Sequence, residues 1–389
     1  MFRKLFRKTP LAWLQISHQK ARLLVATAGI AFADLLMFVQ LGFQDALFDS
    51  QVSPYATLQG DLFLVDKLSD NLGSVKSFSR DNLYQAAGIN GVASVSFLYI
   101  GQADWRNPNN QASRRIFVYG IDPNQPAFKS PEVNQHLDKL KLINRVLFDK
   151  GGRLPQLGDV PTLLKKENPL SVQVNNFEIQ IIGLFVLGSS FSAEGNLITS
   201  DSTFLRIFTQ RQSNEIDVGI VKVKSTATIE QVQASLRAIL PDNLLVLTLD
   251  EFTDRERTYW TTGSFIGFIF GFGVAIGFFV GTVIVYQILY TDVSDHLPEY
   301  ATLKAMGYSD TYFIKVIIQE ALLLAALGFV PGVLLSTGLY SLARSATLLP
   351  IGMKLSRATS VLVLTIVMCI AAGAIALRKL QQADPAEIF

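Results

Sequence analysis

Three histidines and one cysteine are the first residues to consider for catalysis or metal binding. His18, His136 and His296 lie far apart in the chain, and Cys369 is the single cysteine, so an intramolecular disulfide is excluded. The sequence contains no G-x-x-x-x-G-K-[ST] phosphate loop, no H-E-x-x-H zinc motif and no G-x-S-x-G nucleophile elbow. We therefore expect a chain that is not an enzyme and that binds no metal or cofactor itself.

Two acidic residues stand inside apolar segments. Asp34 is near the middle of one apolar run, and Glu320 is about one turn into another. An acid at the centre of a membrane span costs about 2.5–3.5 kcal/mol on insertion scales, so such a side chain faces protein or water. A proton or ion relay would need more than one acid, so we favour a helix–helix contact or hydrated interface for Asp34. Glu320 is close enough to the span end to snorkel toward the cytoplasm.

The composition places these residues in a membrane protein. Hydrophobic residues make up 49% of the chain and charged residues 17%, against about 25% charged residues in soluble domains. The net charge of +2 argues against a nucleic-acid-binding protein, which would carry a basic patch. The first apolar run is too long for a cleaved signal peptide. The second apolar run, residues 261–290, would form ~45 Å of helix. This length exceeds a hydrocarbon core of ~30 Å, so the helix must tilt or project beyond the core.

These runs divide the chain into nine predicted segments. They are a cytoplasmic N-terminal segment (1–22), transmembrane helix 1 (23–43), a periplasmic domain with stalk ends (44–260), transmembrane helix 2 (261–290), a cytoplasmic loop with a docking helix (291–315), transmembrane helix 3 (316–340), a short periplasmic loop (341–358), transmembrane helix 4 (359–377) and a cytoplasmic tail (378–389). The dense basic cluster before the first span, with Arg378 and Lys379 after the fourth, places both termini in the cytoplasm. Arg344, Lys354 and Arg357 in the last periplasmic loop oppose this orientation.

The sequence pattern of the large insert, residues 44–260, predicts an α/β domain. We predict strands at 61–65, 92–103, 115–120, 216–224 and 244–249, and helices at 79–87 and 229–240. Thr228 with Gln231 fits a capping box at the start of the second helix. Two apolar-rich runs, 170–175 and 177–187, meet at a predicted hairpin turn. The pattern indicates two β-α-β units that flank a mostly β middle region.

Glycines recur every four residues in the second apolar run. One row contains Gly263, Gly267 and Gly271, and the other contains Gly273, Gly277 and Gly281. Small residues at this spacing let helix backbones approach closely in a membrane. The rows predict helix packing, either against another span of the same chain or across a subunit interface.

The loop between the second and third spans predicts a short amphipathic helix. Pro298 suits its first turn, and Gly307 suits its end. Leu297, Tyr300, Leu303 and Met306 share one face at i, i+3 spacing. The segment is too weakly basic for a membrane-surface helix, so we expect that face to bind a groove on a partner protein.

The same loop resembles a known family. Residues 299–309 (EYATLKAMGYS), followed by Glu320, resemble the signature of FtsX/MacB-type ABC transporter permeases (type VII). The start at 19–24 (QKARLL, with Gly29-Ile30) and the tail at 382–387 (QADPAE) are similar to that family's first-span entry and ending. Residues 295–308 look like the cyanobacterial DevC-type heterocyst glycolipid exporter permease. Asp295 departs from the pattern, because the family often has arginine there.

The resemblance implies a fold and a set of partners. The fold is an α-helical membrane protein with four transmembrane helices and a large α/β, MacB-like periplasmic domain inserted between helices 1 and 2. Such permeases are homodimers in the bacterial inner membrane, and each subunit docks an ABC ATPase, which binds the ATP and Mg. The docking residues that match the motif are Leu297, Glu299, Tyr300, Leu303, Lys304, Met306 and Gly307.

The resemblance also implies a mechanism. ATP-driven motion of the periplasmic domain would export a lipid or glycolipid cargo through a periplasmic membrane-fusion adaptor and a TolC-like outer-membrane channel. The alternative is an FtsX-like mechanotransmitter that regulates a cell-wall hydrolase without transport. A membrane-anchored enzyme or ligand sensor is a third reading, and residues 44–260 show no cluster of catalytic residues that would favour it.

Overall fold

The computed structural model describes residues 20–190, 192–347 and 349–382. His18, most of the N-terminal basic cluster and residues 383–387 of the tail motif lie outside the described residues. Contacts divide the chain into two compact units, which we call the helical unit (Met1–Ala46, Phe265–Thr347 and Ile351–Phe389) and the sheet unit (Leu47–Ser264 and Leu348–Pro350). Each is described by itself.

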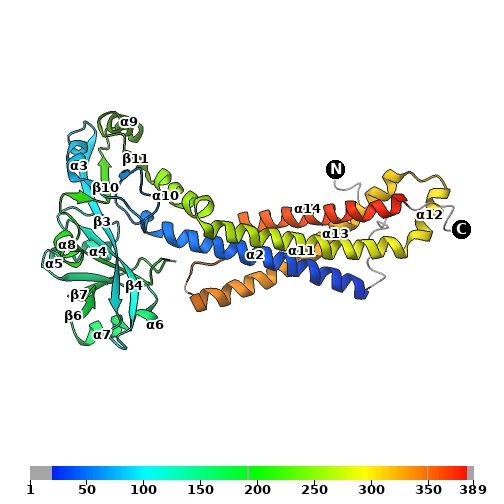
Figure 1. Cartoon of the computed structure of the whole chain (residues 1–389), viewed down its shortest axis with the longest axis horizontal. Helices are drawn as coiled ribbons and strands as arrows, with labels where there is room; N and C mark the ends of the chain where they lie inside the picture. The colour runs from blue at the N-terminus through cyan, green and yellow to red at the C-terminus, as the bar shows by residue number, and fades with distance from the viewer. Residues whose placement is uncertain (1–19, 191, 348, 383–389) are drawn as a thin grey trace. The chain divides into compact units, whose positions relative to one another are not determined.

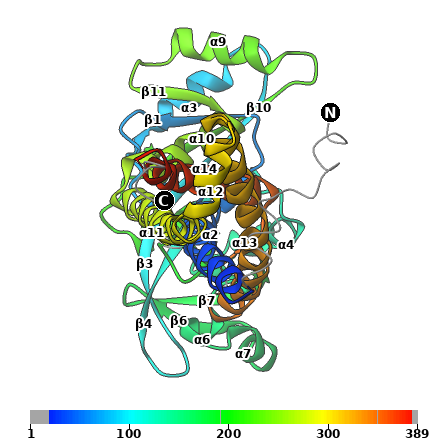
Figure 2. The same ribbon diagram turned by 90° about the vertical axis from the view of Figure 1, so that its right-hand side faces the viewer.

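Long apolar helices form the helical unit. Helix α2 (Lys20–Ala56), α11 (Phe265–Asp295), α13 (Asp310–Thr347) and α14 (Leu355–Gln382) are each long and apolar enough to cross a membrane. They run side by side in Figures 1 and 2. The prediction of four helices long and apolar enough to be membrane spans is thereby confirmed.

Small side chains fill the centre of the bundle. Its core includes Ala33 of α2, Ala321 and Ala325 of α13, and Ala372 and Ala376 of α14. In a membrane no hydrophobic effect drives helices together, so close backbone approach over small residues supplies the packing energy instead. Helix α12 (Leu297–Ala305) is a short separate helix between α11 and α13.

A nine-stranded sheet organises the sheet unit (Figure 1). Its strands are β1 (Leu62–Asp66), β3 (Val92–Arg106), β4 (Ser113–Ile121), β5 (Arg145–Asp149), β6 (Leu170–Val174), β7 (Phe177–Phe185), β8 (Asn196–Ser200), β10 (Val218–Val223) and β11 (Leu244–Thr248). Two short strands, β2 (Phe78–Ser79) and β9 (Glu215–Ile216), pair separately. The helices are α3 (Arg80–Ala87), α4 (Pro131–Asn134), α5 (Leu137–Leu140), α6 (Leu154–Leu157), α7 (Val160–Lys166), α8 (Asp201–Ile207), α9 (Ile229–Ile239) and α10 (Leu249–Thr258).

The two predicted β-α-β units interleave in space. The strand order begins β11-β1-β10-β3, with antiparallel neighbours. Strand β10 therefore lies between β1 and β3, and β1 lies between β10 and β11. This is the split β-α-β arrangement of ferredoxin-like folds. Thr228 caps α9, because its hydroxyl oxygen accepts the Gln231 N–H at 3.4 Å. This hydrogen bond is one half of the predicted capping box.

The middle region closes into a six-stranded barrel. From β3 the order continues through β4, β8, β5, β7 and β6, and β6 pairs back with the far end of β3 through Trp105 and Val174. The β6–β7 hairpin turns at Asn175 and Asn176, both with positive φ, as predicted. Asparagine tolerates this left-handed conformation better than most residues. The fifteen-residue strand β3 thus belongs to both halves of the sheet.

Candidate functional site

Helix α12 forms in the loop where the sequence predicts a short helix. Pro298 lies in its first turn, and it ends just before Gly307, whose φ is +93°. The Tyr308 N–H donates to the Leu303 carbonyl at 3.2 Å, which closes the helix end. Met306 is 63% exposed, Glu299 and Gly307 are exposed, and Leu297, Leu303 and Lys304 are half-buried. The side chain of Tyr300 lies outside the described residues. The helix therefore offers apolar and charged groups on its surface.

One glycine row of α11 packs inside the chain. A Cβ at Gly273 would lie 2.5 Å from Gln40 Cδ, and one at Gly277 would lie 3.2 Å from Met37 Cγ. A Cβ at Gly281 would lie 2.7 Å from the Ala33 Cβ and closer still to Met368 of α14. This row is where α11 approaches α2 and α14.

The other glycine row is less uniform. Gly267 is buried, whereas a Cβ at Gly271 would meet nothing within 4 Å. Gly263 belongs to a π-helical turn, η2 (Tyr259–Gly263), which precedes α11. The two rows therefore differ in what covers them.

Asp34 lies at the centre of the bundle and is fully buried. Its Oδ1 accepts a hydrogen bond from the Thr365 hydroxyl of α14 at 2.6 Å. A Cβ at Gly332 of α13 would lie 2.8 Å from the Asp34 Cβ, so α13 also packs closely here. One acid on α2 thus contacts two other helices.

Glu320 is 2% exposed and has acidic and basic neighbours that the apolar runs do not reveal. It interacts electrostatically with Asp292 of α11 and with Arg22 of α2. Arg22 also forms ion pairs with Asp292 at 3.4 Å and with Asp295 at 2.5 Å. Asp34 and Glu320 therefore belong to two different polar clusters.

A further ion pair joins α2 to α14. Arg357 Nη2 lies 2.6 Å from Asp45 Oδ2, and Arg357 also donates to the Gly352 carbonyl. The guanidinium lies 5.4 Å from the ring centroid of Tyr340, whose hydroxyl donates to the Phe38 carbonyl. The sequence alone predicts Arg357 to be a loop charge, and its partner in the structure lies 312 positions away in the chain.

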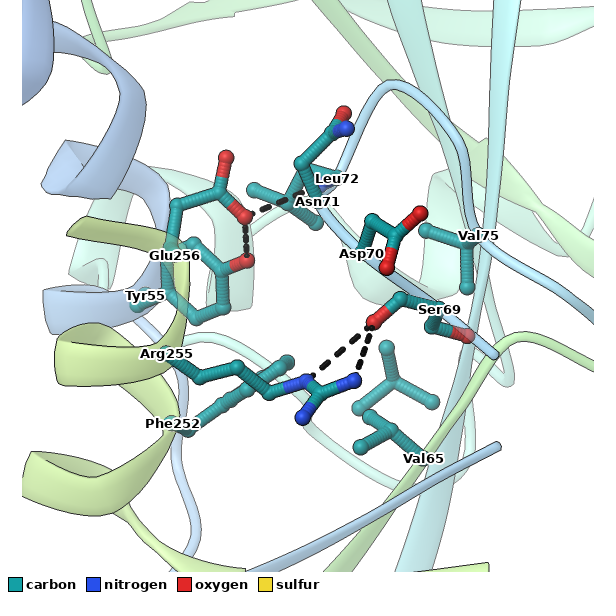
Figure 3. A pocket seen from close by; sticks show the side chains of 11 residues that line it. Tyr55, Val65, Ser69, Asp70, Asn71, Leu72, Val75, Phe252, Arg255 and Glu256 are labelled. Atoms are coloured by element: carbon teal, nitrogen blue, oxygen red, sulfur yellow. Dashed lines mark hydrogen bonds between the residues drawn. The ribbon is translucent and has the colours of Figure 1, made fainter. Parts of the chain in front are cut away.

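In the sheet unit, Glu256 joins three segments (Figure 3). Its Oε2 accepts hydrogen bonds from the Tyr55 hydroxyl at 2.5 Å and from the Leu72 N–H at 2.9 Å, and its Oε1 accepts one from the Trp260 indole at 2.8 Å. Helix α10 is thereby tied to the end of α2 and to the loop after β1. The edge of Phe252 also packs on Tyr55.

Neighbouring arginines reinforce this junction. Arg255 donates to the carbonyls of Lys67 and Ser69, as Figure 3 shows for Ser69. Arg257 lies 2.7 Å from Asp49 of α2. The cavity beside these residues is only about 10 Å³, close to the lower limit for one water molecule. The cluster is therefore a tightly packed junction between α10, the end of α2 and the loop after β1.

Burial raises the pKa of Glu256 above its usual value, although its three hydrogen bonds oppose the shift. A raised folded-state pKa gives stability that is fully present below the unfolded pKa of about 4.3 and is lost as pH rises through the folded pKa. We therefore expect the unfolding free energy of the wild type, relative to Glu256→Gln, to fall as pH rises from about 4. Denaturant unfolding followed by circular dichroism measures this difference.

Glu251 on the same helix is the matched control. A hydrogen bond from the Thr248 N–H lowers its pKa, so its contribution is present above the unfolded pKa and is lost as pH falls. Relative to Glu251→Gln, the wild type should gain stability as pH rises, which is the opposite slope. Equal slopes for the two variants would contradict the assignment.

Comparisons with known proteins bear on both units. Residues 271–385 match the FtsX-like permease C-terminal family. The periplasmic region of MacB from Actinobacillus actinomycetemcomitans is 14% identical, with a TM-score of 0.34 over 51% of this chain and 92% of that one. The extracellular domain of the noncanonic ABC-type transporter YknZ from Gram-positive bacteria is 15% identical, with a TM-score of 0.32 over 49% of this chain and 99% of that one.

No curated protein sequence matches the chain. The match to the FtsX-like permease C-terminal family spans most of α11, all of α12 and α13, and α14. The similarity to that family therefore lies in the part of the chain that forms the long apolar helices after the sheet unit.

Proposed function

We propose that this chain is the permease subunit of an ABC exporter and couples ATP hydrolysis by a separate ATPase to motion of the sheet unit. The observation that carries the proposal is α12, a short helix with exposed apolar and charged groups, set between two membrane helices inside the FtsX-like domain. The ATP and Mg would be held by the ATPase. The permease itself would be a homodimer.

The arrangement supports a location in the bacterial inner membrane with both termini and α12 in the cytoplasm. The main objection was the basic loop before α14. Arg357, which the structure places in the first turn of α14, has a side chain that is 3% exposed and paired with Asp45, so its charge is neutralised within the bundle. The N-terminal basic cluster then dominates the orientation. The sheet unit would accordingly be periplasmic.

The cargo and the outer partners are the finer part of the proposal. We propose a lipid or glycolipid cargo, as in DevC-type exporters, passed to a membrane-fusion adaptor and a TolC-like channel. Purification of the tagged chain in mild detergent, followed by mass spectrometry, tests these partners. An ATPase with an adaptor supports export. An ATPase with a cell-wall hydrolase or its activator supports the FtsX-like mechanotransmitter instead.

The docking role of α12 makes a sharper prediction. Leu303→Asp and Met306→Asp each place a charge on the proposed docking face, so either should abolish co-purification of the ATPase while membrane insertion is retained. Substitution of Met306 separates docking from folding better than substitution of Leu303, because Met306 is 63% exposed and contributes little to folding. Quantitative mass spectrometry of the purified complex measures the loss.

Leu142→Asp is the control, because Leu142 is also exposed, at 54%, but belongs to the sheet unit. It makes the same change of an exposed apolar side chain to an acid and should leave ATPase recovery unchanged. Full ATPase recovery with Met306→Asp would reject α12 as the docking element.

A further inference from the structure

The first turn of α2 is attached to the last turn of α11. Arg22 Nη2 lies 2.5 Å from Asp295 Oδ2, and Arg22 Nη1 lies 3.4 Å from Asp292 Oδ1. The Arg22 side chain is 26% exposed, Asp292 5% and Asp295 47%. The arginine therefore reaches from a nearly buried acid to one at the surface.

The buried part of this cluster places two acids near one arginine. Asp292 and Glu320 are both buried, and each has one carboxylate oxygen without a hydrogen bond among the described residues. The His296 ring Nδ1 lies 3.7 Å from Asp292 Oδ1 and 3.0 Å from the Asp292 carbonyl oxygen. Burying charge is costly unless it is paired, so Arg22 is held firmly in this position.

The exposed ion pair, Arg22–Asp295, lies next to the start of α12. Asp295 is the last residue of α11, and α12 begins two residues later at Leu297. The Arg22–Asp295 pair therefore fixes the point where the chain leaves α11.

We propose that Arg22 is a positioning residue that sets the orientation of α12 through its ion pair with Asp295. The pair links α12 to α2, the helix that continues to Ala56 in the sheet unit. A displacement of α12 by a docked ATPase is thereby passed directly to α2. This step rests on the proposed function, but the ion pair and its effect on α12 can be tested in the chain alone.

The test uses a nitroxide spin label on Thr302→Cys in the purified full-length chain without ATPase. Thr302 is an exposed α12 residue outside the proposed docking face, and the native Cys369 is 0% exposed and stays unlabelled. The electron paramagnetic resonance spectrum of the label reports its mobility. Asp295→Ala should convert the slow-motion component of this spectrum to a fast-motion component, whereas Asp295→Glu should retain the slow-motion component. Arg22→Gln should give the same loss as Asp295→Ala.

The double variant separates the ion pair from general loosening. If the two residues act as a pair, Arg22→Gln with Asp295→Ala should be no more mobile than Arg22→Gln alone. Lys20→Gln, which removes a charge from the same turn of α2, should leave the spectrum unchanged. Additive effects, an unaltered spectrum in Asp295→Ala, or an equal loss in Lys20→Gln would each overturn the proposal.

A second readout distinguishes this idea from the proposed function. With ATPase present, Asp295→Ala should still co-purify the ATPase but should lose ATP-dependent changes in hydrogen exchange of α10. If the wild type binds no ATPase, the proposed function fails while the spin-label result stands. If ATP-dependent exchange in α10 persists in Asp295→Ala, the positioning role is wrong.

Discussion

Gly281→Leu should disrupt the helical bundle more than any other single change on the glycine rows. A Cβ at this position would lie 2.7 Å from the Ala33 Cβ of α2 and would overlap Met368 of α14. Overpacking of a well-packed core typically costs about 1–3 kcal/mol, and here the helix backbones themselves must separate. We expect a cost at or above the upper end of that range, measured as a lower midpoint of thermal unfolding in detergent.

Gly271→Leu is the matched control on the same helix. A Cβ at Gly271 meets nothing within 4 Å among the residues that the structure describes, so the same substitution should leave the unfolding midpoint near that of the wild type. Its effect on self-association, measured by light scattering, then tests whether this side of α11 is a subunit interface. Equal destabilisation by the two variants would contradict the packing argument.

The fold class could be predicted from the sequence because the membrane and the sheet impose simple periods. Continuous apolar runs mark the four long helices, and the sequence cues for the β6–β7 hairpin and the α9 cap agree with the structure. Helix ends were harder. Helix α2 continues past its apolar run to Ala56, because polar residues such as Gln44 and Asp49 extend the helix without a hydropathy signal.

The sheet topology could not be predicted, because local pattern does not determine strand pairing. Strand β1 pairs with β10 and β11, which lie more than a hundred residues later in the chain. Closure of the barrel depends on the last two residues of β3 pairing with β6. Such contacts depend on which apolar faces find each other in three dimensions, and several strand orders share one sequence pattern.

In the candidate site, too, the sequence predicts the important residues but not their contacts. The sequence identified α12, the glycine rows, Asp34 and Glu320 as chemically unusual, but it could not pair them. Arg22 was counted as one of many basic residues before the first span, and its acidic partner Asp295 lies 273 positions away. A charged residue within one turn of a span end is a signal for an ion pair that the sequence does contain. This signal identifies a residue that needs a partner, but it does not identify the partner.

Substituting the two partners of the Arg357–Asp45 ion pair should destabilise the bundle to different extents. The Arg357 side chain is 3% exposed and Asp45 is 34% exposed. Removing one partner of a buried pair costs about 3–5 kcal/mol when the remaining charge stays buried. Asp45→Ala removes the acidic partner of this buried guanidinium and leaves it with neutral neighbours such as the Gly352 carbonyl and Tyr340, so we expect a loss near 3 kcal/mol.

Arg357→Met should cost less than Asp45→Ala, because the carboxylate that it leaves behind is a third exposed and can be hydrated. The methionine also keeps an apolar stem against the Tyr340 ring, which replaces part of the lost packing. Thermal unfolding of both variants and of the double variant measures the asymmetry. The double variant should be more stable than Asp45→Ala alone, since it no longer buries an unpaired charge. If Arg357→Met proved the more damaging single change, the pair would stabilise the bundle through packing and not through charge.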